Sequence, residues 1–400
     1  MNNKLITPEG MKDLLFEECE TRGFVESTLL QMYKSRGFSQ VITPTVEFLD
    51  VFNVQTGYIN SDKMYKFCDS HGRLIALRPD STLPIARLAS TRLKSEVKPI
   101  RLCYNQKMYA SEKALRGKTN EVVQSGIEII GNSSKRGDLE VLFTTVEVLE
   151  GCGIENFTIE IGHIGIFKIL AQKLGVSKST IEKLRSLIEN KNYPALNDAL
   201  DEIGDSKYCY MLKQLPRLFG GDEVFSVAKE LFGDSQINEL LCYLQGIYDD
   251  ITKLGLSDKI SVDLGMVNRT DYYSGIIFRG YIQGHGDAVV SGGRYDNLLK
   301  DFGEDLPAIG FAIDVDAVSK YILDKNKNVK AEVSKVLVFG EAGYEMKALL
   351  QAKALIKAGL IVENCILESV NEAVEYAKQK NIENIYIVAE EVQLKRVGAL

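Results

Sequence analysis

The side chains that most often bind metals or act as nucleophiles are few and widely spaced in this sequence. There are three histidines, His71, His163 and His285, and seven cysteines that form no Cys-x-x-Cys pair. Zinc sites need several such ligands at short spacings, and disulfide frameworks need paired cysteines. We therefore predict no metal and no cofactor, and we interpret His163 and His285 as single packed or exposed residues.

A glutamate inside an apolar run is a stronger candidate for binding chemistry. Glu128 stands among the isoleucines of residues 127–130, where a lone charge on a strand ordinarily faces solvent. Successive residues of a strand point to opposite faces, so Gln124, Gly126 and Glu128 would share one face. This alternation favours a shared polar pocket over a solvated charge.

Other polar or aromatic residues have a structural interpretation beside the functional one. Asp80 follows Pro79 and is typical of a turn or helix cap, with Arg78 as a structural partner. Tyr272 and Tyr273 are of a type that most often packs. The Gly-Gly-Arg string at 292–294 lacks the Gly-Lys-Ser/Thr of a phosphate-binding loop, so we predict a tight turn between strands there.

Composition indicates a globular chain of two or three domains. The 400 residues are 45% apolar and 26% charged, and 48 basic against 55 acidic residues give a net charge of −7. This negative net charge argues against a protein whose main function is to bind nucleic acid. The N-terminus lacks the apolar run of a signal peptide, and no stretch approaches the roughly 20 apolar residues of a membrane helix. We expect a reduced, cytoplasmic protein that binds neither nucleic acid nor membrane.

Three antiparallel strand pairs predict an α+β domain around a mixed or antiparallel sheet flanked by helices. These pairs cover residues 64–79, 100–130 and 272–293, each with Gly, Asp or Ser in its turn. Apolar periodicity predicts a helix from residue 11 to about residue 36, ended by Gly37. A β-branched strand at 40–44, cut by Pro44, should follow it.

The remaining chain divides into an insertion, a linker and a small domain. Helical periodicity recurs in 181–192, 196–203, 224–232 and 237–254, which predicts a helical insertion at about 165–256 within a first domain of residues 1–323. Charged residues at 324–334 predict a linker. The β-α-β-α-β pattern of 335–400 predicts a small α/β domain on a parallel sheet.

Six strings in order resemble the catalytic core of class II aminoacyl-tRNA synthetases, and histidyl-tRNA synthetase most closely. Residues 37–47 resemble the first motif, whose proline lies at the dimer interface, and 124–131 resemble the second strand of the second motif. Residues 77–82 resemble the amino-acid-binding segment, and 271–275 the Asp-Tyr-Tyr signature of the histidyl enzymes. Residues 291–296 and 307–312 resemble the third motif. The resemblance implies the synthetase fold and identifies 335–400 as a truncated anticodon-binding domain.

Three positions depart from that family in the residues that hold ATP. The second-motif arginine is replaced by Ala110, the third-motif arginine by Ala317, and an arginine before the Asp-Tyr-Tyr signature by Asn268, with Arg269 beside it. Phosphoryl transfer needs fixed cations. Asp314 and Asp316 would also repel an anion. We therefore predict no catalytic residues and no adenylate formation, and we interpret the basic residues Arg101, Lys107, Lys113, Arg116 and Lys118 as a solvated cluster around the second hairpin loop.

A chain with the class II synthetase motifs but without the phosphate-binding arginines resembles the family of ATP phosphoribosyltransferase regulatory subunits, which are paralogues of histidyl-tRNA synthetase. That resemblance implies a retained histidine pocket, in which Asp80 and Thr82 bind the ammonium group and Gln124 the other main-chain polar groups. Glu128 and Tyr273 would bracket the imidazole, with Tyr272 in the wall.

The same resemblance implies partners. These are the short-form catalytic subunit of the first step of histidine biosynthesis, a second copy of this chain, a hetero-octamer, and L-histidine as the feedback effector. Two alternatives remain. One is an active histidyl-tRNA synthetase with displaced arginines, Arg116 or Arg269, and the other is a free-standing histidine sensor.

Overall fold

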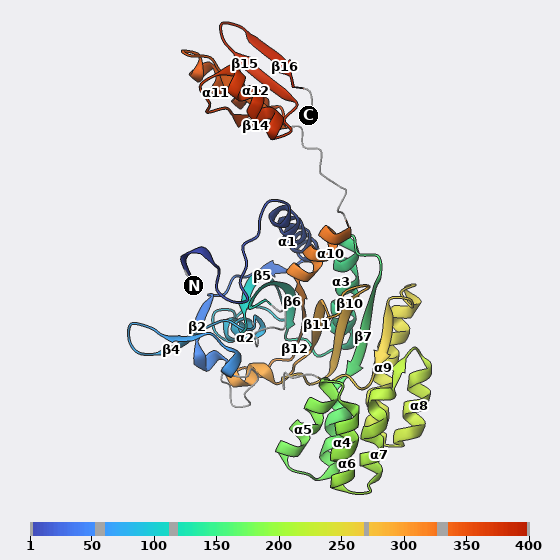
Figure 1. The fold of residues 1–400 in the computed structure, drawn as a ribbon. Coiled ribbons are helices and arrows are strands. Elements are labelled where there is room, and N and C mark those ends of the chain that lie inside the picture. Colours follow the sequence, from blue (N-terminus) through green and yellow to red (C-terminus); the bar gives the residue numbers. More distant parts are fainter. Residues whose placement is uncertain (1–2, 53–60, 112–118, 268–271, 326–334, 398–400) are drawn as a thin grey trace. The chain divides into compact units, whose positions relative to one another are not determined.

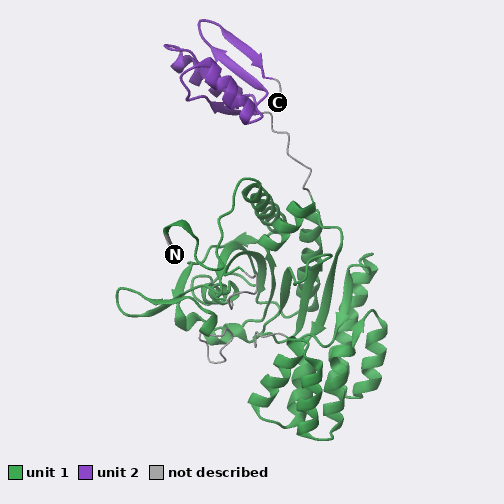
Figure 2. Ribbon diagram, viewed as in Figure 1, with its two compact units in different colours: residues 1–325 green, residues 326–400 purple. Residues whose placement is uncertain are grey.

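The computed structural model describes residues 3–52, 61–111, 119–267, 272–325 and 335–397. They form two compact units, Met1–Lys325 and Asn326–Leu400 (Figure 2). Within the described ranges, no helix is long and apolar enough to cross a membrane.

A nine-stranded sheet organises the first unit (Figure 1). Its strand order is β1-β5-β6-β12-β11-β10-β7-β9-β8. The β1–β5 and β7–β9 pairings are parallel and the other pairings of this sheet are antiparallel, so of the two predicted alternatives, mixed or antiparallel, the sheet is mixed. The strands are β1 (Ser39–Gln40), β5 (Ile100–Tyr109), β6 (Glu121–Ile130), β7 (Phe157–His163), β8 (Phe219–Gly220), β9 (Ile260–Asp263), β10 (Ile276–Ile282), β11 (Val290–Arg294) and β12 (Ala308–Asp314).

Helices α1 (Glu17–Ser35), α3 (Lys135–Gly151) and α10 (Val315–Lys325) pack against β5, β6 and β12. The inner faces of these helices and strands are fully buried, as the side chains of Leu29, Val141 and Ile127 show. Tyr33 of α1 meets Phe311 of β12 edge-on, with ring centroids 6.0 Å apart. One face of the sheet is thereby closed, and Gln124, Gly126 and Glu128 of β6 lie on the other.

The first helix begins later than its apolar pattern predicted. Residues 11–16 are not helical, and Leu15 is 58% exposed. A turn closes at residue 11, whose N–H donates to the Pro8 carbonyl, and the Gly10 carbonyl accepts the N–H of Asn120. This tertiary contact fixes the segment before the helix. The helix begins at Glu17, and the Glu18 carboxylate of its first turn accepts the N–H of Leu15 in the preceding segment, 3.2 Å away.

A three-stranded sheet of order β2-β4-β3 precedes the second helix. β3 (Lys66–Cys68) and β4 (Leu74–Leu77) form the predicted hairpin, and β2 (Val46–Phe48) pairs with β4. The predicted strand at 40–44 is largely wrong, because β1 ends at Gln40 and residues 41–44 form no strand. Helix α2 (Thr82–Ser90) follows β4 directly.

The helical insertion is present and contains two helices that the periodicity missed, α4 and α7. Its helices are α4 (Ile164–Leu174), α5 (Lys178–Glu189), α6 (Tyr193–Ile203), α7 (Lys207–Gln214), α8 (Glu223–Phe232) and α9 (Ser235–Lys253). Capping side chains mark several starts, since Ser177, Ser206 and Asp234 each accept a backbone N–H of the following turn. Short 3₁₀ turns lie at Asn3–Leu5, Leu49–Val51, Ser61–Lys63, Leu215–Arg217 and Leu298–Phe302.

The Gly-Gly-Arg string is not a turn, contrary to our prediction. Residues 292–294 belong to β11, where the two glycines pair with both β10 and β12 and Arg294 pairs with β12. The glycines are required by packing instead. A Cβ on Gly293 would lie 2.7 Å from the Tyr273 ring, and one on Gly292 would overlap the ring of Phe278.

The second unit has the predicted alternation with one added strand. β13 (Lys335–Gly340), α11 (Glu345–Lys357), β14 (Ile361–Asn364), α12 (Val370–Gln379) and β15 (Asn384–Val388) are followed by β16 (Val392–Arg396). The order is β14-β13-β15-β16, and the β16 pairing is antiparallel, so the sheet is mixed rather than parallel. Helix α10 continues to Lys325, which makes the first two residues of the predicted linker helical, and 326–334 lie outside the described residues.

Candidate ligand-binding site

A polar cavity of about 180 Å³ opens on the face of the main sheet opposite α1 and α3. The structure brings together around it all six residues that the sequence suggested. Its described lining residues are Asp80, Thr82, Gln124, Glu128, Tyr272, Tyr273, Ser291, Tyr295, Gly310, Phe311 and Ala312. Pockets for drug-sized ligands measure about 300–1,000 Å³, so this volume suits a smaller molecule.

Three separate chain segments supply the predicted residues. Gln124 and Glu128 project from β6, and Asp80 and Thr82 stand at the amino end of α2. Tyr272 and Tyr273 precede β10. Since β6 pairs with β12, which pairs with β11, the register carries the polar face of β6 across to Ser291 and Tyr295.

Glu128 is the most constrained group of the cavity, and its carboxylate does not face solvent. The residue is 2% exposed and accepts hydrogen bonds from the Thr82 hydroxyl, at 3.0 Å, and from the Tyr295 hydroxyl. Burial raises the pKa of Glu128 to about 8, although the two hydroxyl donors favour the ionised form. The group can therefore gain or lose a proton near neutral pH.

Asp80 combines the structural role expected of it with a place in the cavity wall. Its carboxylate accepts the N–H of Leu83, 2.8 Å away, and so caps α2. Burial raises the pKa of Asp80 to about 6, and the backbone N–H groups of Leu83 and Thr82 oppose that rise. Arg78 donates elsewhere, to the carbonyl oxygens of Thr43 and Lys107.

Three tyrosines form the aromatic wall. The ring centroids of Tyr272 and Tyr273 are 4.8 Å apart, and those of Tyr272 and Tyr295 are 5.6 Å apart. Burial raises the pKa of all three hydroxyls, so each phenol is neutral and can donate. Tyr295 was not predicted. Its place two residues after Gly293, on the cavity side of β11, is the signal that could have identified it.

A glycine on β12 makes room for the buried carboxylate. Gly310 pairs with Glu128 across the two strands, and a Cβ there would overlap the Glu128 carboxylate. Any side chain at 310 would therefore displace Glu128.

The arrangement selects for a small ligand with two separate positively charged or hydrogen-bond-donating groups. Two carboxylates stand at different points of the wall, with Gln124, whose side-chain oxygen accepts the Tyr104 hydroxyl at 3.3 Å, beside them. Among the described residues that line the cavity, none is lysine or arginine. A phosphate group would have no cation to meet it there.

The predicted losses of phosphate-binding arginines fall outside the cavity wall. Ala110 follows β5 and bonds the Asn120 carbonyl, and Ala317 lies in the first turn of α10. Asn268 and Arg269 lie outside the described residues. Asp316, from which we expected repulsion of an anion, pairs with Arg22 of α1, which offsets its charge. Asp314 instead caps α10, where it accepts the Ala317 N–H at 2.9 Å.

The predicted basic cluster is not one cluster. Arg101 lies at the start of β5, where it pairs with Glu140 and stacks on Phe38, whereas Lys107 pairs with Glu121 near the opposite end of the strand. The other three members, Lys113, Arg116 and Lys118, lie outside the described residues.

The histidines take no part in the cavity. His163 is buried, accepts the Gly165 N–H at 3.1 Å and meets Tyr243 edge-on, as expected of a packed residue. His285 bonds the Asp287 carbonyl in the loop between β10 and β11. Among the described residues, no group of three or more His, Cys, Asp or Glu side chains could hold a metal ion.

Comparison with known proteins gives a family model and close curated relatives. The family model described as Histidyl-tRNA synthetase matches residues 10–318. The chain is 42% identical to the ATP phosphoribosyltransferase regulatory subunit of Clostridium kluyveri, over 95% of this chain and 98% of that protein. It is 39% identical to the protein of the same name from Clostridium acetobutylicum, over 96% of each chain.

Solved structures show the same fold. A structure described as an ATP phosphoribosyltransferase regulatory subunit/histidyl-tRNA synthetase from Bacillus halodurans superimposes with a TM-score of 0.83 at 26% identity, covering 96% of this chain and 98% of that one. Histidyl-tRNA synthetase from Nostoc gives a TM-score of 0.79 at 22% identity, covering 98% and 94%. These matches confirm the class II synthetase-like fold that the six strings indicated.

The buried glutamate makes the stability of the first unit depend on pH. The pKa of Glu128 is about 8 in the folded state against an ordinary 4.5, so between these values the folded state holds more protons than the unfolded one. The free energy of unfolding should therefore fall as pH rises from about 4.5 to about 8, by up to about 1.4 kcal/mol per pH unit, and be insensitive to this group above that range. Urea unfolding at successive pH values measures it.

A matched pair of variants isolates the Glu128 contribution. Glu128→Gln should flatten the slope relative to the wild type. Glu121→Gln, on the same strand beside Lys107, should leave it unchanged. Equal slopes for all three proteins would contradict the assignment of the pH dependence to Glu128.

Proposed function

Because the chain belongs to the family of ATP phosphoribosyltransferase regulatory subunits, we propose that it activates a short-form catalytic subunit and makes that subunit sensitive to L-histidine. The catalytic subunit condenses ATP with phosphoribosyl pyrophosphate in the first step of histidine biosynthesis. The observation that carries the proposal is the cavity, which has polar groups for an amino acid and, in its described wall, no cation for a phosphate.

Histidine suits the cavity at both ends. Its ammonium group can bond Asp80, whose carboxylate stands at the start of α2, and the hydroxyl of Thr82 lies beside it. Gln124 can meet the other main-chain polar groups. The imidazole carries an N–H that Glu128 can accept, and Tyr273 has a neutral phenol for the second ring nitrogen. A site with buried polar groups rejects a ligand that leaves them unpaired, so apolar amino acids should bind poorly.

Loss of aminoacylation is the second part of the proposal. Adenylate formation requires cations on the phosphoryl oxygens, and removing a single transition-state donor costs about 2.7–4 kcal/mol. Alanine stands at 110 and 317, where the synthetases carry arginine. The similarity to the Nostoc synthetase covers 94% of that chain. Chain length therefore does not distinguish a regulatory subunit from an active synthetase. ATP–pyrophosphate exchange stimulated by histidine would instead indicate an active synthetase with displaced arginines.

The domain assignment follows the same proposal. Residues 1–323 act as a synthetase-type core that holds the effector, with the helical insertion within it, and 335–400 act as a domain of anticodon-binding type without a tRNA-reading role. Binding partners are the catalytic subunit, as the names of the relatives imply, and a second copy of this chain. We propose a hetero-octamer of four chains of each kind.

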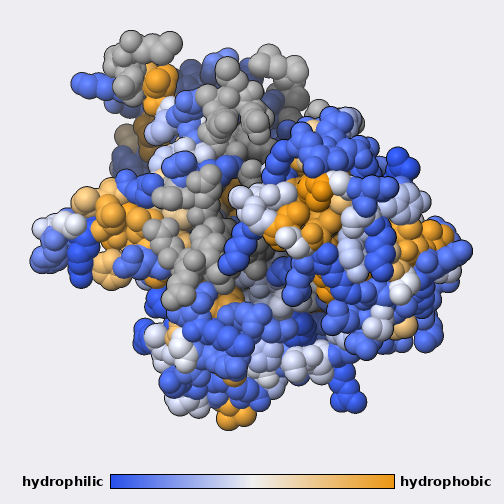
Figure 3. Space-filling view, turned by 90° about the horizontal axis from the view of Figure 1, so that it is seen from below, coloured by the Kyte–Doolittle hydropathy of each residue, from blue (hydrophilic) through white to orange (hydrophobic). Residues whose placement is uncertain are grey.

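An exposed apolar surface supports self-association through the first-motif region. Ile42 is 77% exposed, and Val46, Phe48, Phe67 and Leu74 of the small sheet and its approach are 38–54% exposed. Apolar side chains gather over the projecting β3–β4 hairpin at the left of the space-filling view (Figure 3). Contiguous apolar patches on a folded chain mark interaction sites, and the first motif lies at the dimer interface in the synthetases that this region resembles.

Phosphoribosyl-ATP formation by the same organism's catalytic subunit tests the regulatory role directly. The chain should raise the rate strongly, and added histidine should reverse the gain. Asp80→Asn removes a hydrogen bond between two charged groups, worth about 1.5–3 kcal/mol, and should raise the inhibitory histidine concentration roughly 10- to 100-fold. Glu128→Gln should raise it by a smaller factor, because burial keeps the Glu128 carboxyl group largely neutral near pH 7 and a hydrogen bond between neutral groups contributes about 0.5–1.5 kcal/mol.

Activation in the absence of histidine should survive both substitutions, because neither side chain lies on the exterior of the chain. Glu121→Gln provides the control on β6 and should leave inhibition unchanged. If the chain fails to activate, the regulatory role is wrong. If both cavity variants retain normal inhibition, histidine is sensed elsewhere.

Self-association has its own test. Ile42→Asp places a charge on the apolar surface near the first motif and should shift the chain from dimer to monomer in analytical ultracentrifugation, because a buried unpaired charge opposes association. Val227→Asp on α8, where the valine is 52% exposed, is the matched control and should remain dimeric. A dimer of unchanged affinity in Ile42→Asp would locate the interface elsewhere.

A further inference from the structure

The last residue of β11 and the residue after it point to opposite faces of the sheet and into two different polar systems. Tyr295 reaches the cavity, where its hydroxyl bonds Glu128. Arg294 lies on the other face, is 6% exposed, and pairs with Asp138 of α3, its Nε 2.9 Å from the carboxylate. One short piece of backbone therefore connects the ligand cavity with a buried ion pair behind it.

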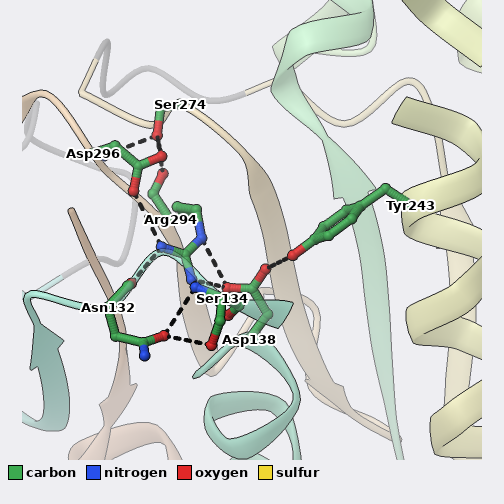
Figure 4. A network of polar contacts seen from close by, with 7 residues as sticks. All are labelled: Asn132, Ser134, Asp138, Tyr243, Ser274, Arg294 and Asp296. Atoms are coloured by element: carbon green, nitrogen blue, oxygen red, sulfur yellow. Dashed lines mark hydrogen bonds and ion pairs between the residues drawn. The ribbon is translucent and has the colours of Figure 1, made fainter. Parts of the chain in front are cut away.

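The network around Arg294 includes the helical insertion (Figure 4). The Asp138 carboxylate that accepts the guanidinium also accepts the hydroxyl of Tyr243, which projects from α9. Asp138 is fully buried, so its charge depends on these donors. On the other side, the Arg294 guanidinium bonds the Asn132 carbonyl at 2.8 Å and the Asp296 carboxylate at 3.1 Å.

The same network holds the aromatic segment of the cavity. The N–H of Ser274 donates to the Arg294 carbonyl at 2.8 Å, and its hydroxyl donates to Asp296 at 2.9 Å (Figure 4). Ser274 directly follows Tyr272 and Tyr273 in the chain. The position of both phenols is thus tied to Arg294, and through Asp138 to Tyr243 of the insertion.

A second contact reaches the aromatic segment from the insertion directly. Lys168 of α4 donates to the carbonyl oxygen of Tyr273 at 2.7 Å. Helices α4 and α9 are joined to each other, because Lys173 near the end of α4 pairs with Asp234, the residue that caps α9. The two insertion helices that approach the cavity are therefore linked to one another as well as to the tyrosines.

We propose that Lys168 and Tyr243 are positioning residues through which the helical insertion sets the affinity of the cavity for histidine. Neither side chain lines the cavity. Displacement of the insertion, as when another subunit binds it, moves the Tyr272–Ser274 segment and changes the fit of the ligand. By linkage, bound histidine then favours one placement of the insertion, and this differential affinity is what feedback inhibition requires. The inference rests on the proposed function, since it concerns the regulation of the same site.

Histidine affinity of full-length variants tests the proposal. Lys168→Met and Tyr243→Phe should each weaken histidine binding about fivefold or more in isothermal titration calorimetry, and Lys168→Arg should restore part of the loss. The matched controls lie in the same insertion. Lys229→Met removes a lysine of α8 that bonds Gln245 of α9, and Tyr248→Phe removes a hydroxyl from α9. Both should bind histidine as the wild type does.

Amide hydrogen exchange distinguishes a positioning role of Lys168 and Tyr243 from a merely structural one. In the wild type, histidine should slow amide exchange in α4 and α9, although no residue of either helix lines the cavity. In Lys168→Met and Tyr243→Phe this protection should be reduced, even at histidine concentrations that saturate the cavity. The wild-type measurement also decides the matter if a variant fails to fold.

The outcomes separate this inference from the proposed function. If the wild type binds no histidine, the proposed function fails and the inference falls with it. If the wild type binds histidine but both insertion variants match their controls, or if histidine leaves α4 and α9 exchange unchanged, only the role of the insertion is overturned. Weakened binding with normal thermal stability supports it.

Discussion

Burial of one carboxylate in the middle of a sheet face constrains much of the first unit. Glu128 is 2% exposed, and a carboxylate removed from water must be hydrogen-bonded or neutralised. Thr82, at the start of α2, and Tyr295, just after β11, supply the donors. β12 must pass without a side chain at Gly310. Segments more than 200 residues apart in sequence are therefore placed around a single side chain, and the cavity is the space that this placement leaves.

The strand that contributes Tyr295 also separates two kinds of polar chemistry. On the cavity side lie carboxyl groups and neutral phenols, which can bond a ligand that carries hydrogen-bond donors. On the far side, Arg294 and Asp138 already neutralise each other. Because successive residues of a strand point to opposite faces, the adjacent residues Arg294 and Tyr295 belong to these two different environments. Because the backbone between them is shared, the internal ion pair and the ligand site cannot be positioned independently, which is why the insertion bears on the cavity.

Three arginines of the first unit have structural partners. Arg78 bonds the backbone carbonyls of Thr43 and Lys107, Arg22 neutralises Asp316, and Arg294 neutralises Asp138. At 110 and 317, the positions at which we propose that phosphate-binding arginines are lost, the chain has alanine. The sheet and the polar groups of the cavity depend on strand register and packing, and neither alanine lies in the cavity wall.

Local patterns in the sequence determined the mixed sheet, the helical insertion and the six cavity residues that were named. Hairpin turns, apolar periodicity and family strings are all short-range signals. The late start of α1, the antiparallel β16, and the partners Tyr295, Lys168 and Tyr243 were missed. The glycines at 292 and 293 have the local character of a turn, and only the rings of Phe278 and Tyr273 packed against them show why a strand requires them. Tertiary structure alone decided these features, because each depends on a contact between residues that are far apart in the sequence. Neither periodicity nor composition indicates which distant residues will be in contact.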